Sequence, residues 1–297
     1  MESVAICICT YKRYESLRTL LENLTLIVKP DSYKVSIIVV DNDPSGSASG
    51  IQADFEEVKY FLETNKGVSS ARNRSIEESG KLGADIIAFL DDDEVPSKNW
   101  LIDMLDALNN YSADIVAGPV IAELPDDLKA FSPFMARKRH PTGTPIKYWG
   151  AGNVLLRAKV FHQVGLFSQD YSETGGEDTQ FSARCSKQGL HMVWSDTATV
   201  VEPTDATRAN PKWLNDRAYA NGRIIARVER ELNIGDVRRR AVIALLRLLA
   251  GVLAWPISLI VDRIFRTRFS LLCSMSMRKG LGMTEEIFKG SKRISSA

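Results

Sequence analysis

Four acidic residues in succession, Asp91, Asp92, Asp93 and Glu94, have the clearest capacity for chemistry in this sequence. They follow the apolar run 86–90, which predicts a strand. Adjacent carboxylates repel one another, so we expect a positive charge at this strand end. Oxygen ligands without His or Cys suit a hard divalent cation, Mg²⁺ or Mn²⁺, and such ions usually also bind substrate phosphates. The acidic run therefore predicts a site for a phosphate-bearing substrate.

Alternation along an extended strand places Asp91 and Asp93 on one side and Asp92 on the other. We expect Asp93 to be the direct metal ligand, with Asp91 oriented toward a ribose or a metal-bound water. The structural alternative is an acidic loop in which one Asp or Ser97 caps the next helix. A cap needs one such residue and not four, which favours the metal site.

The composition is that of a globular protein, with 297 residues, 44% hydrophobic and 25% charged residues. This length suits one large domain, or one domain with an appendage. The net charge of +1 gives no basis for general nucleic-acid binding. We interpret the cysteines as small buried residues in a reducing compartment, because their spacing predicts neither a metal finger nor disulfides. They are Cys7, Cys9, Cys185 and Cys273. We expect no signal peptide at the N-terminus.

The first hundred residues alternate strand-like and helix-like segments, which predicts a mostly parallel sheet with helices on both faces. The predicted strands are 4–9, 35–40, 58–62 and 86–90, and a helix covers 17–24. A second helix opens near residues 65–70, with Ser69 or Ser70 as its N-cap. Further on, 193–201 is strand-like, 125–145 forms a long loop, and a polar helix covers 211–232.

Polar clusters follow three of these strands, at Thr10-Tyr11-Lys12, Asp41-Asn42-Asp43 and Asp91-Asp92-Asp93. In parallel sheets, ligands bind beyond the carboxyl ends of the strands. The three clusters therefore predict one ligand-binding rim.

With these motifs in this order, residues 3–230 resemble the family 2 glycosyltransferases, which have the nucleotide-binding GT-A fold. The resemblance rests on Cys9 to Arg13, Asp41, Gly67 to Asn73, Asp91 with Asp93 as a DXD motif, and Glu177-Asp178. It implies transfer of a sugar from a nucleoside diphosphate, most often UDP, with inversion. It also implies a catalytic domain at 1–232, divided into a nucleotide-sugar half (1–112) and an acceptor half (113–232).

The resemblance implies a set of nucleotide-binding residues. These are Thr10, Tyr11, Arg13, Asp41, Arg72, Asp91 and Asp92. Arg72 lies near the start of a helix after a glycine and can pair with phosphate. Alternatives remain for three of them. Tyr11 can be a partly buried aromatic residue, Asp41 can form a turn, and Arg72 can belong to a solvated helix face.

Asp178 is the candidate base that takes the proton of the acceptor hydroxyl, and Glu177 is expected to hold the nearby geometry. The glycines at 175–176 allow a bend into a helix whose first turn favours an ionised carboxylate. The alternative is that both carboxylates only complement the helix dipole.

Trp149 and Gly150 are candidates for an acceptor shelf, since a flat ring packs on sugar faces, although a core tryptophan fits equally well. Many relatives carry a late histidine that completes the metal site, whereas this strand end offers Glu202. Glu202 is a third candidate metal ligand beside Asp93 and Asp91, or a structural residue.

The segment 241–261 is almost wholly apolar and is flanked by arginines at 238–240 before it and at 263, 266 and 268 after it. Its length suits a membrane-spanning helix, an in-plane helix on anionic lipid, or a core or dimer helix. We expect 233–297 to be a membrane-associating helical tail, with the catalytic domain in the cytosol at the cytoplasmic face of the inner (plasma) membrane. The expected acceptor is a glycan or a polyprenyl-diphosphate-linked oligosaccharide in bacterial polysaccharide synthesis.

Two other functions fit less well. A sugar-phosphate nucleotidyltransferase usually has a glycine-rich loop after its first strand, and the loop at 10–14 contains no glycine. A non-catalytic carbohydrate-binding or membrane scaffold would not need the carboxylates Asp91, Asp93 and Asp178.

Overall fold

The computed structural model describes residues 1–265 and 267–294, with side chains up to residue 289. Arg266, one of the flanking arginines, lies outside the described residues. The chain divides into two compact units, the first made of 1–123 with 136–203, and the second of 124–135 with the described residues from 204 onward. The predicted catalytic boundary at 232 lies further along the chain, and it stays a prediction because compactness does not test which residues catalysis needs.

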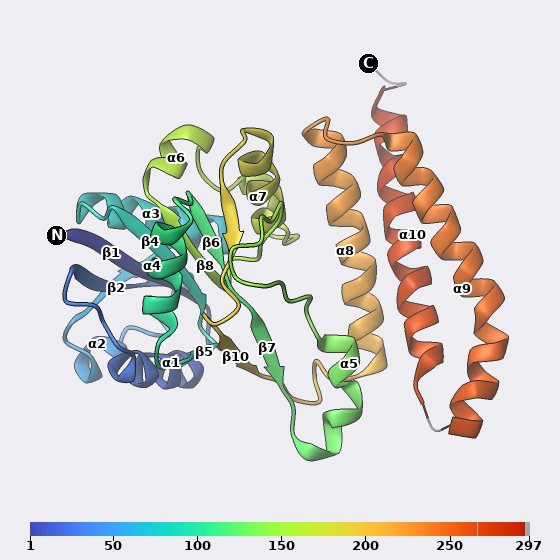
Figure 1. The fold of residues 1–297 in the computed structure, drawn as a ribbon, viewed down its shortest axis with the longest axis horizontal. Coiled ribbons are helices and arrows are strands. Elements are labelled where there is room, and N and C mark those ends of the chain that lie inside the picture. Colours follow the sequence, from blue (N-terminus) through green and yellow to red (C-terminus); the bar gives the residue numbers. More distant parts are fainter. Residues whose placement is uncertain (266, 295–297) are drawn as a thin grey trace. The chain divides into compact units, whose positions relative to one another are not determined.

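The first unit is built on a seven-stranded sheet with the order β3-β2-β1-β4-β8-β6-β9 (Figure 1). All pairs are parallel except those made by β8, which runs antiparallel to β4 and β6. The strands are β1 (Glu2–Thr10), β2 (Tyr33–Asp41), β3 (Val58–Leu62), β4 (Ile86–Asp91), β6 (Ile115–Ala117), β8 (Asn153–Arg157) and β9 (Met192–Trp194). A small second sheet joins β5 (Val95–Pro96), β10 (Val200–Pro203) and β7 (Val120–Glu123).

Helices cover both faces of the large sheet, as predicted. One core lies under α1 (Tyr14–Leu26), α2 (Ile51–Asp54) and α4 (Trp100–Asn110). The other lies under α3 (Val68–Lys81), α6 (Lys159–Val164) and α7 (Glu177–Lys187). Alternate residues of β1 enter the two cores, Ile6 into the first and Cys7 into the second. This is why its sequence shows no polar alternation.

The predicted N-cap of α3 is wrong. Gly67 occupies the N-cap position with φ 117°, and Ser69 and Ser70 lie inside the helix. Their hydroxyls instead donate to Ser168 O and Gln169 Oε1, at 2.8 and 3.0 Å. Local propensity predicted that these serines cap the helix, but their hydroxyls bond to residues far along the chain instead.

Two segments differ from their sequence-based assignments. The strand-like run 193–201 is interrupted and contributes to two strands, β9 and β10, in different sheets. The predicted long loop contains a short 3-10 helix, η1 (Asp126–Phe131), followed by α5 (Ser132–Met135).

The second unit contains three long helices, α8 (Pro211–Glu231), α9 (Val237–Phe265) and α10 (Phe269–Ile294), with η1 and α5. The prediction of a polar helix over 211–232 is confirmed, and Asn210 caps it by accepting the Trp213 N–H at 2.9 Å. The predicted helical tail at 233–297 contains both α9 and α10, although α10 had no predicted bounds of its own. Among the described residues, one helix, α9, is long and apolar enough by length and composition to cross a membrane.

Candidate active site

The three polar clusters meet at one edge of the sheet. In the strand register, Thr10 pairs with Asp41 and Cys9 pairs with Asp91. The carboxyl ends of β1, β2 and β4 are therefore neighbours, which is the arrangement that places a ligand beyond them.

Arg13, at the start of α1, joins two of the acidic residues. Its Nη1 donates to Asp92 Oδ1 and to Asp93 Oδ2, each at 2.9 Å. Asp92 also accepts a hydrogen bond from the Thr10 hydroxyl at 2.7 Å. Burial raises the pKa of Asp92, and Thr10 and Arg13 oppose that rise. The proposed helix-cap alternative is wrong, because Asn99 occupies the N-cap position of α4.

Arg72, in α3, joins the other half of the site. Its guanidinium pairs with Glu177 at the start of α7 and donates from Nη2 to Asp91 Oδ1 at 3.1 Å. Only 7% of Arg72 is exposed, so it does not belong to a solvated helix face. Burial would lower the pKa of Arg72, but the charges of Glu177 and Asp91 outweigh it and raise that pKa. This arginine stays charged and holds the DXD carboxylate beside the candidate catalytic helix.

Glu177 and Asp178 differ in their surroundings. Glu177 is buried, and desolvation raises the pKa of its carboxyl although the charge of Arg72 lowers it. Asp178 is half-buried, and its Oδ1 accepts the Thr179 N–H. A Cβ atom at Gly150 would lie 3.5 Å from Asp178 Oδ2, so the exposed Gly150 leaves open space beside the candidate base.

Trp149 lies in the core and does not form an exposed shelf. It is 6% exposed, with its ring centroid 5.8 Å from that of Phe181. Its indole Nε1 has no hydrogen-bond partner among the described residues. Trp149 is therefore a core tryptophan, the alternative to the acceptor shelf, whereas Gly150 is exposed.

Asp41 is fully buried, and both of its carboxylate oxygens accept hydrogen bonds from within the chain. Oδ1 accepts the Asp43 N–H at 2.9 Å, and Oδ2 accepts the Ala48 N–H at 2.7 Å and the Tyr60 hydroxyl at 3.1 Å. This geometry matches the turn-forming alternative, because the carboxylate organises the loop after β2. Tyr11, by contrast, is 49% exposed and presents a ring that a base can stack on.

The contacts that Glu94 and Gly152 make with Asp91 were not predicted from the sequence. Glu94 is buried, and its Oε2 accepts the Asp91 N–H at 3.1 Å. A Cβ atom at Gly152 would collide with Glu94 Oε1 and lie 2.9 Å from Asp91 Oδ2. Burial and the charge of Asp91 raise the pKa of Glu94 well above its ordinary value. Gly152 therefore makes room for the carboxylates at the end of β4, a fit that sequence spacing does not reveal.

Glu202, in β10, forms an ion pair with Arg137 at 2.7 Å and is largely buried. Its charge is close enough to contribute to the raised pKa of Glu94. Glu202 thus lies in the electrostatic surroundings of the acidic run, with its charge balanced by an arginine.

The donor set fits a hard divalent cation in chemistry, since Asp91 and Asp93 offer carboxylate oxygens and Gly152 keeps one side of Asp91 clear. Within residues 1–265 and 267–294, no group of three or more His, Cys, Asp or Glu side chains is arranged to hold a metal. A magnesium-type ion usually takes one or two carboxylates with substrate phosphates, so two protein ligands are consistent with it.

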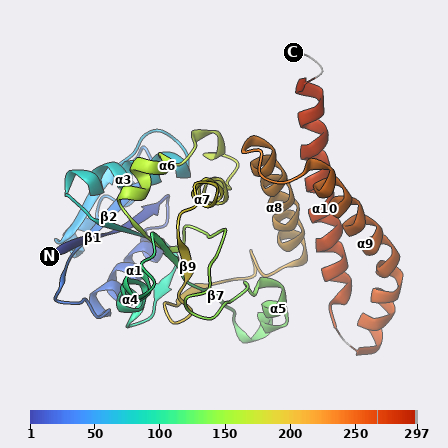
Figure 2. The ribbon, with the colours of Figure 1, turned by 45° about the horizontal axis from the view of Figure 1, so that its top comes forward.

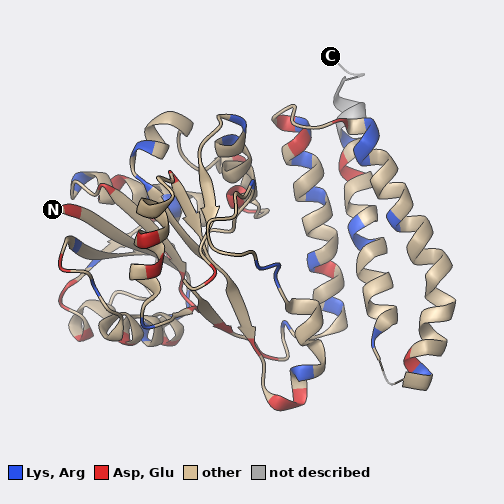
Figure 3. Ribbon diagram, viewed as in Figure 1, with Lys and Arg blue, Asp and Glu red and all other residues tan. Residues whose placement is uncertain are grey.

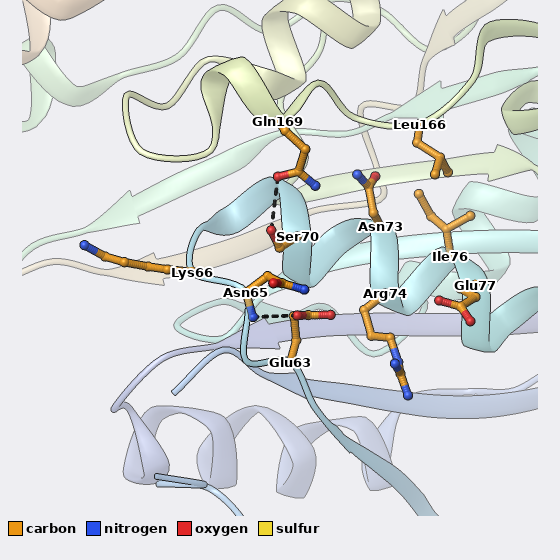
Figure 4. A pocket seen from close by; sticks show the side chains of 10 residues that line it. All are labelled: Glu63, Asn65, Lys66, Ser70, Asn73, Arg74, Ile76, Glu77, Leu166 and Gln169. Carbon is orange, nitrogen blue, oxygen red and sulfur yellow. Dashed lines mark hydrogen bonds between the residues drawn. The ribbon is translucent and has the colours of Figure 1, made fainter. Parts of the chain in front are cut away.

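A separate cavity of about 890 Å³ lies on another face of α3 (Figure 4). Its lining has carboxylates, amides and cations in mixture, and two hydrogen bonds cross it, from Ser70 to Gln169 and from Asn65 to Glu63. None of Asp91, Asp93 and Asp178 lines it, so the cavity is distinct from the carboxylate cluster.

The sheet order, the DXD residues at the end of β4 and the carboxylates at the start of α7 define a GT-A nucleotide-sugar transferase. Solved structures that share this fold include a mannosyltransferase and GalNAc-T7. The mannosyltransferase PcManGT from Pyrobaculum calidifontis, in complex with GDP-Man and Mn²⁺, aligns with TM-score 0.66 and 13% identity, covering 95% of this chain and 86% of that one. GalNAc-T7, with UDP, GalNAc and Mn²⁺, aligns with TM-score 0.57 and 12% identity, covering 76% and 51%.

A family model described as Glycosyl transferase family 2 matches residues 5–165. The succinoglycan biosynthesis protein ExoM of Rhizobium meliloti (strain 1021) is 30% identical over 240 residues, which is 76% of this chain and 74% of ExoM. The chain therefore belongs to glycosyl transferase family 2, as its motifs predicted.

Proposed function

We propose that this glycosyltransferase transfers a sugar, with inversion and with a divalent cation, from a nucleoside diphosphate to a hydroxyl of a membrane-held glycan acceptor. The observation that carries the proposal is the pair of salt bridges made by the guanidinium group of Arg72. It joins Asp91 of the DXD motif to Glu177 of the catalytic pair, so both halves of the site are held together.

The donor is proposed to bind at the ends of β1 and β4. Asp93 and Asp91 would hold Mn²⁺ or Mg²⁺. When bound, this cation would neutralise the negative charge that develops on the leaving diphosphate. Tyr11 offers an exposed ring for the base, and Thr10, Arg13 and Asp92 form the wall beside it. We propose UDP as the nucleotide, on the family's common use.

Asp178 is proposed to accept the proton of the attacking hydroxyl. It is the half-exposed carboxylate of the catalytic pair, and it faces the space left by Gly150. Glu177 is buried on Arg72 and cannot reach the same space without breaking that ion pair. The two neighbours therefore have different roles, Asp178 moving the proton and Glu177 positioning α7.

A lipid-linked acceptor, such as a polyprenyl-diphosphate oligosaccharide in bacterial polysaccharide synthesis, is supported by two observations. The relative ExoM is a succinoglycan biosynthesis protein. The second unit carries one helix apolar enough to associate with a membrane. The catalytic unit is proposed to act in the cytosol, at the cytoplasmic face of the inner membrane.

Calorimetric titration with UDP and Mn²⁺ tests the donor site first. We expect binding that is lost in EDTA and in Asp93→Ala, and retained in Asp31→Ala, which removes an exposed carboxylate far along the chain from the acidic run. GDP serves as the competing nucleotide. Binding of UDP that survives both EDTA and Asp93→Ala would contradict the metal-dependent site.

Asp178→Asn then tests the chemistry. We expect transfer to fall by about 100-fold or more, since general-base catalysis contributes 10²–10⁴-fold, while UDP affinity stays unchanged. A variant that retains full transfer would refute the assignment of the base. A wild-type protein that binds UDP and acceptor but transfers nothing would favour the scaffold.

A further inference from the structure

The second unit carries an apolar surface whose arrangement is inverted relative to a soluble helix. In α9 the fully buried residues are small or polar, and most of the large apolar side chains are exposed; Ile243 and Leu248 are the partly buried ones that pack toward the other helices. Ala244, Gly251 and Ser258, seven residues apart, are buried. Large apolar residues are exposed along the whole helix, among them Val242, Leu246, Leu253, Ile257, Ile260 and Ile264.

The one charge within 241–261 also faces inward. Arg247 is half-buried, and its Nη1 donates to Ser276 Oγ of α10 at 3.4 Å. A helix on a water-soluble protein normally turns its apolar stripe inward and its charges outward. Small residues at the helix–helix contact and large apolar residues outside are typical of helices in contact with lipid.

The packing of the three helices determines how α9 can meet a membrane. In both ribbon views α10 lies between α8 and α9 (Figures 1 and 2). A Cβ at Gly251 would collide with Met277, and one at Gly222 of α8 would collide with the Lys279 backbone. Both glycines therefore mark close packing against the same stretch of α10. The middle of α9 is consequently level with the middle of α8.

Charged residues occur along α8, including its middle (Figure 3), and three of them pair with residues of α10. Asp216 pairs with Arg278 at 3.0 Å. Two arginines pair with the buried Glu286, Arg223 in the middle of α8 at 3.7 Å and Arg230 near its C-terminal end at 2.7 Å. If α9 crossed a bilayer with this layer intact, these charges would enter the hydrocarbon. Each charged side chain at that depth disfavours insertion by about 100-fold.

Exposed arginines lie at both ends of the apolar surface, Arg238 and Arg239 before it and Arg263 after it. An in-plane helix brings both ends to the headgroups of one leaflet, where arginines bind anionic lipid. A spanning helix would send one of these ends to the opposite side.

We propose that α9 lies in the plane of a single anionic leaflet, with its exposed apolar face in the acyl boundary and α10 and α8 stacked on its other side. The inference rests on the membrane association proposed above and is independent of the transfer chemistry. The occupant of this surface is a lipid leaflet, and a second copy of the chain is an outcome that the test separates.

Binding of the full-length protein to vesicles of 30% anionic and 70% zwitterionic lipid tests the surface. We expect Leu253→Glu combined with Ile257→Glu to lower partitioning by about 100-fold, since two large apolar side chains leave the acyl boundary. The matched control is Leu26→Glu in α1, because Leu26 is 70% exposed and Leu253 is 73% exposed. UDP binding is measured on the wild-type protein and on every variant. A wild-type protein that binds UDP but does not bind vesicles would overturn this inference and leave the proposed donor site intact.

Orientation is tested with the fluorophore NBD on Val242→Cys and, separately, on Ile264→Cys, which lie at the two ends of the exposed face. Protein added to preformed vesicles is treated with dithionite, which does not cross the bilayer. We expect both labels to be bleached completely. Protection of one end would show a spanning helix, and a stable dimer without vesicle binding would show a second copy on the face; either result overturns the inference.

Discussion

Replacing Arg72 by methionine should destabilise the chain by about 3–5 kcal/mol, the usual result of removing one partner from a buried ion pair. Arg72 is 7% exposed and its partner Glu177 is 5% exposed. At the 3.1 Å separation from Asp91, two unit charges in an effective dielectric of 20 attract by about 5 kcal/mol. Asp91 is 47% exposed, so solvent screens much of that attraction and most of the loss comes from Glu177.

The stability lost in Arg72→Met should depend on pH, because the ionisation of Glu177 contributes to it. Burial raises the pKa of Glu177 and the charge of Arg72 opposes it, so the pKa should rise further in Arg72→Met. A carboxyl whose folded pKa lies above its unfolded pKa destabilises the fold as pH rises through the folded value. The free energy of unfolding that Arg72→Met loses relative to the wild type should therefore be larger at pH 8 than at pH 5. Arg72→Met combined with Glu177→Gln should recover most of the stability and lose this pH dependence.

Urea unfolding followed by circular dichroism at both pH values measures these differences. Arg18→Met is the control, because Arg18 pairs with Glu22 at 3.2 Å with both side chains about half exposed. That pair should contribute about 0.3–0.5 kcal/mol. A cost for Arg72→Met below about 1 kcal/mol, or no recovery in the double variant, would refute the proposed role of the buried ion pair.

Three further outcomes are expected. Gly152→Ala should cost about 1–3 kcal/mol in urea unfolding and weaken UDP binding, because its methyl group collides with Glu94, whereas Gly80→Ala, with nothing within 4 Å, should do neither. Burial raises the pKa of Cys7 to about 11 and of Cys185 to about 12. At pH 8 about 0.1% or less of these two thiols is ionised. In the native protein they should therefore react with Ellman's reagent at least about 100-fold more slowly than a free thiol. Equal reaction rates would contradict this expectation. EDTA should abolish UDP binding yet shift the melting temperature by less than about 2 °C, because arginines already balance the strand-end carboxylates; a larger fall would show a structural metal.

The sequence predicted the parallel core of the large sheet because the signals for buried strands are local. The unalternated apolar run 4–9 predicted a strand buried on both faces, and β1 sends neighbouring residues into two cores. Strand ends followed by polar clusters predicted the binding edge, and the register joins Thr10 to Asp41 and Cys9 to Asp91. Both inferences depend only on the two-residue period of a strand and on parallel pairing.

Other features depend on partners far along the chain, and these were missed or wrong. Ser69 and Ser70 looked like N-caps, but their hydroxyls bond to a loop 99 residues away. Asp41 was predicted to contact a nucleotide base, and that stays a prediction; its bonds to Tyr60 and two backbone amides were not predicted. Trp149 looked like a shelf, although its ring packs on Phe181. Such partners are set by tertiary packing, which one sequence does not contain.

The expectation of a positive charge beside the acidic run is met by arginines from separate segments. Arg13 reaches Asp92 and Asp93, and Arg72 reaches Asp91, at distances of 2.9 to 3.1 Å. The repulsion argument alone therefore does not require a metal, because guanidinium groups already balance part of the charge. What favours the cation is the chemistry of the leaving group, since a diphosphate brings new negative charge that arginines bound to carboxylates are not free to neutralise. We therefore expect the metal ion to bind together with the nucleotide. UDP binding measured by calorimetry should then require the metal, whereas the stability of the fold should require neither the metal nor the nucleotide.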